Sequence, residues 1–181
     1  MKKKQDDLWV YILLEAALLI FIESLKTFHV SINKVLISLS IPIIPFIFLI
    51  TNIIIKKNNY KKGLLSVVIS LIAAILFVLL MSFALNRQID MKLYIGEAVA
   101  YIVSELVNIF IYKYIQNNTK KSYPLIYLSY IFSLIFFYMT YTLSYLNSNI
   151  IDGYWQRYSI SIIIQIIICI PITIIDKKIA K

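Results

Sequence analysis

The sequence predicts an all-α integral membrane protein in which one domain, residues 1–181, forms a bundle of six transmembrane helices. Of the 181 residues 61% are hydrophobic and the mean hydropathy is +0.83, whereas a soluble domain is about half apolar. The chain contains only three Gly and four Pro, and its charges gather in short clusters. A helix needs about 20 apolar residues to cross a bilayer. Six runs qualify, at residues 8–28, 35–55, 63–85, 93–115, 123–146 and 154–175.

The positively charged residues predict that both termini face the cytoplasm. Cytoplasmic loops of membrane proteins carry an excess of Lys and Arg, and most of those in this chain fall at one end of the predicted bundle. They are Lys2, Lys3, Lys4, Lys56, Lys57, Lys61, Lys62, Lys113, Lys120, Lys121, Lys177, Lys178 and Lys181. We therefore expect a multi-pass protein of the cell inner (cytoplasmic) membrane. The net charge of +9 reflects these topology signals, so we expect the lipid bilayer and no nucleic acid as a partner.

The first predicted helix begins close to a basic N-terminus, as a secretory signal does. It contains Glu15 and Glu23, lacks a small-residue cleavage site and is long enough to span, so we interpret it as a retained helix. Glu23 lies near the outer end, where we expect it to face water beside Lys26. Glu15 lies deeper and needs either a partner or the loss of its charge. The third predicted helix is almost purely apolar, and we expect it to face lipid.

Residues 93–115 carry the pattern on which the functional prediction depends. Polar side chains recur there at spacings of three, four, seven and eight, which places them on one helical face; they are Glu97, Tyr101, Ser104, Glu105, Asn108 and Tyr112. The opposite face is apolar, with Ile95, Val99, Ile102, Val103, Leu106, Ile109 and Phe110. Ionisable groups are costly in hydrocarbon, so the polar stripe predicts a substrate or ion pathway. The alternative is a set of interhelical hydrogen bonds that only holds the bundle together.

The second predicted helix, residues 35–55, contains Pro42 and Pro45 near its outer third. Each Pro removes a backbone donor and bends or breaks a helix, and broken helices often border ligand sites in transporters. An ordinary kink is the alternative. Toward the inner end, Thr51 and Asn52 add polar groups.

The last two predicted helices contribute aromatic and amide side chains. Phe136, Phe137 and Tyr138 lie in the middle of the fifth helix, where they either stack on a planar ligand or pack in the core. Gln165 lies deep in the sixth helix and needs a hydrogen-bonding partner there.

Few residues of this chain fit enzymatic or metal chemistry. Cys169 is the single cysteine, and His29 is the single histidine, which we expect to be solvated in a loop. The sequence contains no Walker-type phosphate loop. We predict that the protein is not an enzyme and has no catalytic residues, metal site or cofactor.

Two stretches resemble signatures of a known transporter family. Residues 44–52, Ile-Pro-Phe-Ile-Phe-Leu-Ile-Thr-Asn, followed by a basic loop with Tyr60-Lys61-Lys62, are similar to the second-helix signature of the VUT-type queuosine-precursor transporters. Residues 98–113 are similar to a later signature of that family, and the helix with Gln165 and Pro171 resembles its ending more weakly. The resemblance spans roughly the second to the sixth predicted helix.

The resemblance implies a six-helix carrier for a 7-deazaguanine precursor of the tRNA base queuosine. The implied fold is similar to the substrate-binding subunits of energy-coupling-factor vitamin transporters. The chain matches the family at Phe48, Thr51, Tyr101 and Ser104. It departs from the usual Asp at Asn52 and Asn108, from Glu at Lys56 and from Gln at Glu105, so the solute stays open.

The hypothesis we favour is a carrier for a small nucleobase-like or vitamin-like solute. A carboxylate that faces an amidine-like edge makes paired, charge-assisted hydrogen bonds. The predicted substrate-binding residues are Glu97, Tyr101, Ser104, Glu105, Asn108, Asn52 and Glu15. Two alternatives are a substrate-binding subunit of a multi-chain energy-coupled transporter and a non-transporting membrane scaffold. The partners expected are thus a small solute and either partner subunits or further copies of this chain.

Overall fold

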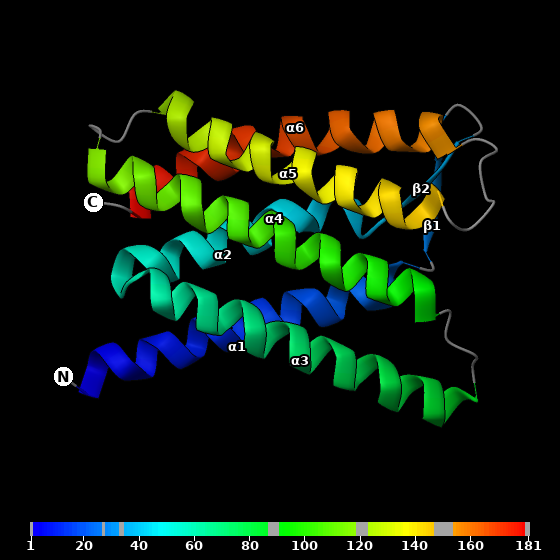
Figure 1. The fold of residues 1–181 in the computed structure, drawn as a ribbon, viewed down its shortest axis with the longest axis horizontal. Coiled ribbons are helices and arrows are strands. Elements are labelled where there is room, and N and C mark those ends of the chain that lie inside the picture. The colour runs from blue at the N-terminus through cyan, green and yellow to red at the C-terminus, as the bar shows by residue number, and fades with distance from the viewer. Residues whose placement is uncertain are drawn as a thin grey trace.

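The computed structural model describes residues 2–26, 28–32, 35–86, 91–118, 123–146 and 154–179. The elements, labelled in Figure 1, are α1 (Lys2–Leu25), β1 (His29–Ile32), β2 (Val35–Ser38), the 3-10 helix η1 (Ile41–Ile43), α2 (Ile44–Lys57), α3 (Tyr60–Leu85), α4 (Met91–Asn118), α5 (Tyr123–Leu146) and α6 (Tyr154–Ile179). Within these residues α1, α3, α4, α5 and α6 contain segments long and apolar enough to cross a membrane. The predicted helical membrane fold is therefore confirmed only in its coarser part, because five helices of the described residues, and not six, are long and apolar enough to cross a membrane. The bounds of α3 to α6 lie within a few residues of the prediction.

The prediction of one continuous helix over residues 35–55 is wrong in its first half. Those residues form β2 and η1, and α2 begins only at Ile44 and is 14 residues long. Pro42 and Pro45 each occupy the first or second position of a helix. Pro is tolerated there because the first amides of a helix have no helical acceptor. The two prolines thus begin two short helices instead of bending a long one.

Gln165 supplies a donor that Pro45 lacks. In a continuous helix the amide of residue 45 bonds the carbonyl of Ile41, but proline has no amide hydrogen. The Gln165 side-chain Nε2 donates to the Ile41 carbonyl at 2.8 Å. The expectation that Gln165 needs a partner at depth is confirmed, and the bond ties α6 to the start of the α2 region.

A β-hairpin connects α1 to η1, which the helical prediction missed. Strands β1 and β2 are antiparallel, and His29 pairs with Ser38 and Ile32 with Val35. His29 therefore lies in a strand and not in a loop. The sequence lacks the Asn-Gly or Asp-Gly pair that marks a two-residue hairpin turn, since Asn33 and Lys34 stand between the two runs, and the length of the apolar run that follows favoured a helix.

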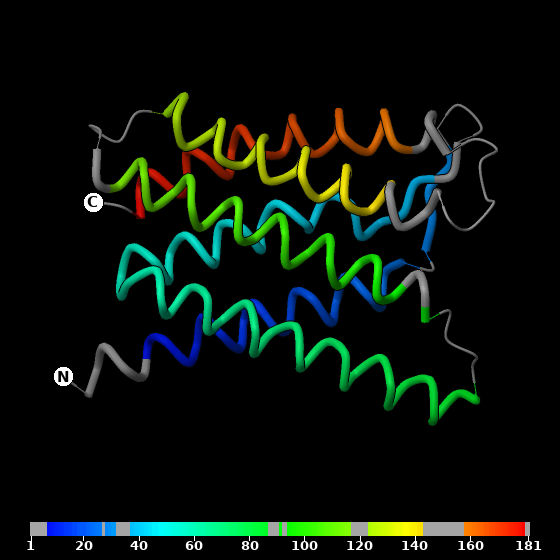
Figure 2. The backbone as a smooth tube through the Cα atoms, viewed as in Figure 1, coloured from blue at the N-terminus to red at the C-terminus, as the bar shows by residue number. Residues whose placement is uncertain are grey.

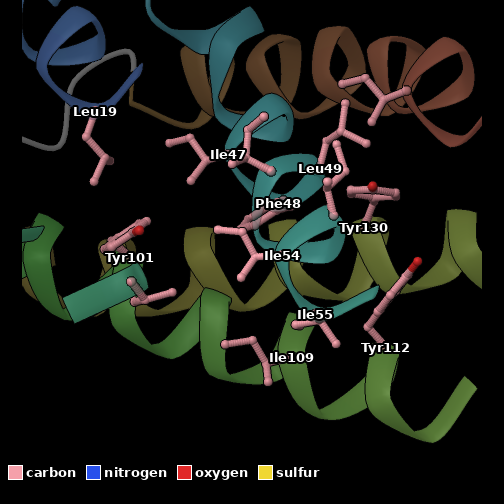
Figure 3. Close-up of a cluster of buried hydrophobic side chains, with 14 of the residues drawn as sticks. Leu19, Ile47, Phe48, Leu49, Ile54, Ile55, Tyr101, Ile109, Tyr112 and Tyr130 are labelled. Carbon is pink, nitrogen blue, oxygen red and sulfur yellow. The ribbon is translucent and has the colours of Figure 1, made fainter. Parts of the chain in front are cut away.

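Helix α2 occupies the centre of the bundle. It contacts each of the other five α-helices, and Figures 1 and 2 show it between the α1–α3 pair and the group formed by α4, α5 and α6. Ten of its residues are buried, Pro45 and the continuous run Ile47–Ile55. Figure 3 shows Ile47, Phe48 and Ile54 of α2 among side chains from the surrounding helices. A helix buried on every face belongs to the core of a protein.

The long helices expose apolar side chains on the outside of the bundle. On α3 the exposed residues include Leu65, Val68, Ile72, Leu76, Leu79, Leu80 and Phe83, as a lipid-facing helix requires. Its inner face contains small residues: Gly63, Ser66, Val67, Ser70 and Ala74. On α4 the predicted apolar face is exposed at Ile95, Val99, Ile102, Leu106 and Phe110, but Ile109 is buried in the core.

Helices α2 and α3 approach closely at their connection. Asn59 caps α3 by accepting a hydrogen bond from the Lys62 amide at 3.0 Å. A Cβ placed on Gly63 would lie 2.7 Å from Ile55 Cγ1, so a larger residue would push the two helices apart.

The bundle has two chemically different ends. The start of α1, the α2–α3 connection and the end of α6 lie together (Figure 1), and this end contains Lys57, Lys61, Lys62, Lys113, Lys177 and Lys178. We call it the lysine-rich end. The β-hairpin lies at the opposite end, which we call the hairpin end.

A buried ion pair joins α2 to α6 near the lysine-rich end. Lys56 Nζ lies against Asp176 Oδ1, and their side chains are 5% and 0% exposed. The same carboxylate accepts hydrogen bonds from Tyr130 at 2.7 Å, from Tyr112 at 3.1 Å and from Asn52 at 3.3 Å. Figure 3 shows Tyr112 and Tyr130 on α4 and α5 beside α2. We refer to these five residues as the Asp176 network.

We predict that Asp176→Asn destabilises the folded protein by about 3 kcal/mol, because the change leaves a buried lysine without its counter-charge. The measurement is the free energy of unfolding of the purified protein in detergent.

Two variants test the cause of that loss. Asp7→Asn removes an exposed carboxylate and should change stability by less than about 0.5 kcal/mol. The double variant Lys56→Met, Asp176→Leu should recover much of the loss, since apolar pairs often replace buried ion pairs well. Wild-type stability in Asp176→Asn would contradict the assignment.

Candidate functional site

A cavity of about 410 Å³ lies toward the hairpin end, around the first turns of α2. All six α-helices and both strands contribute to its lining. The polar and aromatic lining residues are Glu23, Lys26, His29, Ser38, Ser40, Phe48, Tyr94, Glu97, Tyr101, Ser104, Phe137, Tyr138, Tyr141, Tyr158 and Ser161. Its remaining walls are aliphatic. Pockets of this kind, mostly apolar with a few polar groups, are typical small-molecule sites.

The polar stripe predicted on α4 extends beyond the cavity. Glu97, Tyr101 and Ser104 line it, whereas Glu105, the residue after Ser104, and Asn108, about one turn farther along α4, are completely buried and do not line it. Tyr112 belongs to the Asp176 network. The stripe thus crosses three environments from the hairpin end to the lysine-rich end.

Charged side chains meet where α1 and α4 border the cavity. Lys26 Nζ lies 2.6 Å from Glu23 Oε1 and also pairs with Glu97 Oε2. The hydroxyl of Tyr141 donates to Glu97 Oε1 at 3.1 Å. Burial lowers the pKa of Lys26, but the carboxylates of Glu97 and Glu23 outweigh this effect and raise that pKa above its ordinary value. Lys26 therefore stays positively charged.

The expected contact between Glu23 and Lys26 is present, but Glu23 does not simply face water. Its side chain is 16% exposed, lines the cavity and leaves Oε2 buried without a hydrogen-bonding partner. Because this oxygen has almost no exposed surface, it becomes an acceptor for a bound molecule only when the side chain turns toward the cavity.

Aromatic rings form one wall of the cavity. Phe137 stacks on Tyr141 with ring centroids 6.0 Å apart, and Tyr138 meets Tyr158 edge-on at 4.7 Å. Phe136, which we had grouped with Phe137 and Tyr138, is 40% exposed on the outside of the bundle. The prediction of aromatic side chains at a ligand site therefore fits Phe137 and Tyr138, and it is wrong for Phe136.

Tyr101 connects the cavity to a deeper layer of polar groups. It lines the cavity, and its hydroxyl donates to Glu15 Oε1 at 2.8 Å. The partner expected for Glu15 is thus on α4. The hydroxyls of Ser66, Thr51 and Ser70 also lie beside the Glu15 carboxyl group. Glu15 itself is buried below the cavity and does not line it.

Glu105 lies in the same deep layer. Its Oε2 accepts a 3.4 Å hydrogen bond from Asn108 Nδ2, which also reaches the carbonyl of Phe48 at 3.4 Å. Thr51 lies beside the Glu105 carboxyl group as it does beside that of Glu15. We call Glu15 and Glu105 the carboxyl pair.

Asn52 does not line the cavity. It donates a hydrogen bond to Asp176 and so belongs to the Asp176 network. The seven predicted residues therefore separate into three in the cavity, three in the deep layer (Glu15, Glu105, Asn108) and one in the network.

Several important residues were missed by the sequence analysis. Ser66 and Ser70 lie on the helix that we expect to face lipid, although their four-residue spacing with Ala74 marks a small-residue face suited to helix packing. The sequence patterns do not single out Asp176, and Lys56 enters only as one of the positive residues that predict topology and as a departure from the family pattern. No pattern in the neighbouring sequence indicates that Lys56 and Asp176 contact each other, since 120 residues separate them.

Nothing in the described part of the chain points to a catalytic metal centre. No group of three or more His, Cys, Asp or Glu side chains there is close enough to hold a metal ion. What the cavity offers instead is hydrogen-bond acceptors on one side and aromatic faces on another, which is the chemistry of binding.

Comparisons of the chain with protein-family models, with curated proteins and with solved structures find no match. The functional assignment accordingly rests on the residues and on the geometry of this cavity.

Proposed function

We propose that the protein is a membrane carrier that binds a small planar solute in the cavity. The observation that carries the proposal is the position of Glu97, a carboxylate on a membrane helix that lines a cavity of about 410 Å³. Small-molecule pockets measure roughly 300–1,000 Å³. Ionisable residues inside membrane helices commonly mark solute or ion pathways.

Recognition of the solute involves exchange of existing hydrogen bonds. Glu97 is held by Lys26 and Tyr141, and a solute with amino and ring N–H groups replaces one of these donors. Glu23 Oε2 supplies a further acceptor. The rings of Phe137 and Tyr138 offer a wall on which a planar solute packs.

The solute class we favour is a 7-deazaguanine precursor of queuosine or another nucleobase-like or vitamin-like compound. Such molecules combine a flat aromatic ring with an edge of N–H donors, and a carboxylate pairs well with an edge of this kind. The resemblance of residues 44–52 and 98–113 to the VUT-type transporters supports the same class.

A second candidate is the substrate-binding subunit of an energy-coupled transporter with several chains. It is favoured by the absence of a Walker-type loop from the sequence, because a partner would then supply nucleotide hydrolysis. Co-purification of such a partner distinguishes this candidate from a carrier that works alone. A scaffold role would draw support only from the Asp176 network, where polar side chains serve packing.

We further propose that the lysine-rich end faces the cytoplasm in the inner membrane. Its lysines fit the excess of positive charge that cytoplasmic loops carry. The α1 start and the α6 end then lie on the cytoplasmic side, and the cavity lies nearer the outside.

The first prediction concerns solute binding. A ligand at about a hundred times its Kd should stabilise the purified protein by about 2.7 kcal/mol. The measurement is thermal unfolding with 7-cyano- and 7-aminomethyl-7-deazaguanine, queuine, common purines and B vitamins. We expect a shift with at least one member, and we expect Glu97→Gln to remove it because the amide replaces an acceptor pair with one acceptor and one donor.

Asp7→Asn serves as the matched control, since it removes a carboxylate that is exposed and outside the cavity, and it should retain the full shift. A shift of equal size in Glu97→Gln would show that this carboxylate does not recognise the solute. Absence of any shift across the panel would reject these solutes for the purified chain.

The second prediction concerns orientation. Cys169 is completely buried, so the native chain should react little with a membrane-impermeant maleimide. Lys61→Cys at the lysine-rich end should react only after the cells are permeabilised, whereas Ser31→Cys in β1 should react in intact cells. Both positions are exposed. The reverse pattern would overturn the proposed orientation.

A further inference from the structure

The carboxyl pair lies directly below the solute cavity, in the middle of the bundle. Glu15 comes from α1 and Glu105 from α4, and both are 0% exposed. Each carboxyl group acts on the other electrostatically, and Thr51 of α2 lies beside both. Helix α3 adds the hydroxyls of Ser66 and Ser70. Four helices, α1 to α4, thus contribute oxygen atoms around the carboxyl pair.

Several of these oxygen atoms lack a hydrogen-bonding partner. Glu15 Oε2, Glu105 Oε1, Thr51 Oγ1, Ser70 Oγ and Asn108 Oδ1 are all buried and unpaired. Buried polar atoms are nearly always satisfied in native proteins, so each exception needs an explanation. Here the exceptions are concentrated around one pair of carboxyl groups, and all are able to accept.

Among the residues that the structure describes, no positive side chain pairs with either carboxyl group, since the ion pairs there involve Lys26 and Lys56 and none includes Glu15 or Glu105. In this described part, the other titratable side chain that acts on the pair is Tyr101. Two ionised carboxyl groups in a low-dielectric interior are unfavourable, so such a pair either takes up a proton or binds another cation.

We propose that the carboxyl pair binds a small monovalent cation, a proton or a sodium ion, that is coupled to binding of the solute in the cavity. Carboxylate, hydroxyl and amide oxygens are the ligands of such hard cations, and buried carboxyl groups in membrane helices act in proton pathways. The coupling part of this proposal rests on the proposed carrier function; the cation site itself does not.

Tyr101 provides the physical connection between the two sites. Its ring lines the cavity and its hydroxyl donates to Glu15 at 2.8 Å. A solute that moves this ring changes the donor available to the carboxyl pair. A cation that binds the pair changes the position of the ring, and such coupling is reciprocal for binding free energies.

Thermal unfolding of the detergent-purified full-length protein tests the cation site without any solute. One arm replaces choline chloride with sodium chloride at constant pH, and the other varies pH without sodium. A cation that binds the folded state raises the unfolding midpoint in a saturable way. Sodium dependence at constant pH identifies sodium, and dependence on pH alone identifies the proton, with the midpoint rising as the pH falls.

Glu105→Gln should lose that dependence, because the neutral amide removes the charge but keeps the shape of the side chain. Glu15→Gln provides the second variant and should lose the dependence as well, while Asp7→Asn should retain it. All other ionisable side chains are the same in these proteins and in the wild type, so the difference from wild type isolates the pair.

Two results would overturn the proposal. One is a wild-type midpoint that changes with neither cation, a measurement that needs no variant. The other is an unaltered dependence in a folded Glu105→Gln or Glu15→Gln protein. Because this experiment contains no solute, neither result bears on the solute-binding test at Glu97. In the same way, failure of the Glu97 test would not affect the conclusion about the cation site.

The coupling is tested with a solute that shifts the wild-type midpoint. The Kd of this solute should differ between high and low concentrations of the identified cation. In Tyr101→Phe the ratio of these two Kd values should move toward one. Because Tyr101→Phe also removes a donor to Glu15, its cation dependence is first measured without solute, and the comparison with solute is made relative to that value. An unchanged ratio in that variant would show that Tyr101 does not connect the two sites.

Discussion

The ion pair between Lys56 and Asp176 anchors the one helix around which the bundle is built. Helix α2 is short and buried, and its C-terminal turn would carry a lysine into the interior without a counter-charge. Burial of both ions costs free energy. The donors from Tyr112, Tyr130 and Asn52 offset that cost by saturating the carboxylate. The network joins α2, α4, α5 and α6 at one end of the molecule, so the position of α2 depends on it.

The start of α2 depends on two prolines, which lack the amide hydrogen that a helix interior needs. Because Pro42 and Pro45 lack amide hydrogens, the chain before Ile44 leaves the helical path and forms a hairpin and a 3-10 turn. If α2 were as long as the other helices, it would fill the centre of the bundle along its whole length. Because α2 is short, a cavity remains around its first turns, where Ile44, Ile47 and Phe48 line the wall. The same break that shortens α2 therefore makes room for the cavity.

Helix α4 runs past the cavity, the deep polar layer and the Asp176 network. From the hairpin end, Glu97 meets Lys26, Tyr101 reaches Glu15, Glu105 completes the carboxyl pair and Tyr112 donates to Asp176. Its opposite face is exposed and apolar, apart from Ile109, which packs in the core. Helix α4 thus contributes side chains to the cavity, to the deep polar layer and to the Asp176 network. This arrangement suits a carrier in which binding and access are linked.

The sequence by itself determined the membrane class, the four long helices α3 to α6 and the polar stripe on α4. These features are local: an apolar run satisfies its own backbone hydrogen bonds as a helix, and spacing along that helix decides which residues share a face. It also indicated that Glu15 and Gln165 need partners. The tertiary structure decided which partners they have, since Tyr101 is 86 residues from Glu15 and the Ile41 carbonyl 124 residues from Gln165. It likewise separated Asn52 from the cavity and divided residues 35–55 between a strand and a helix. Those choices depend on which helices become neighbours, and that depends on packing around α2 and not on any single stretch of the chain.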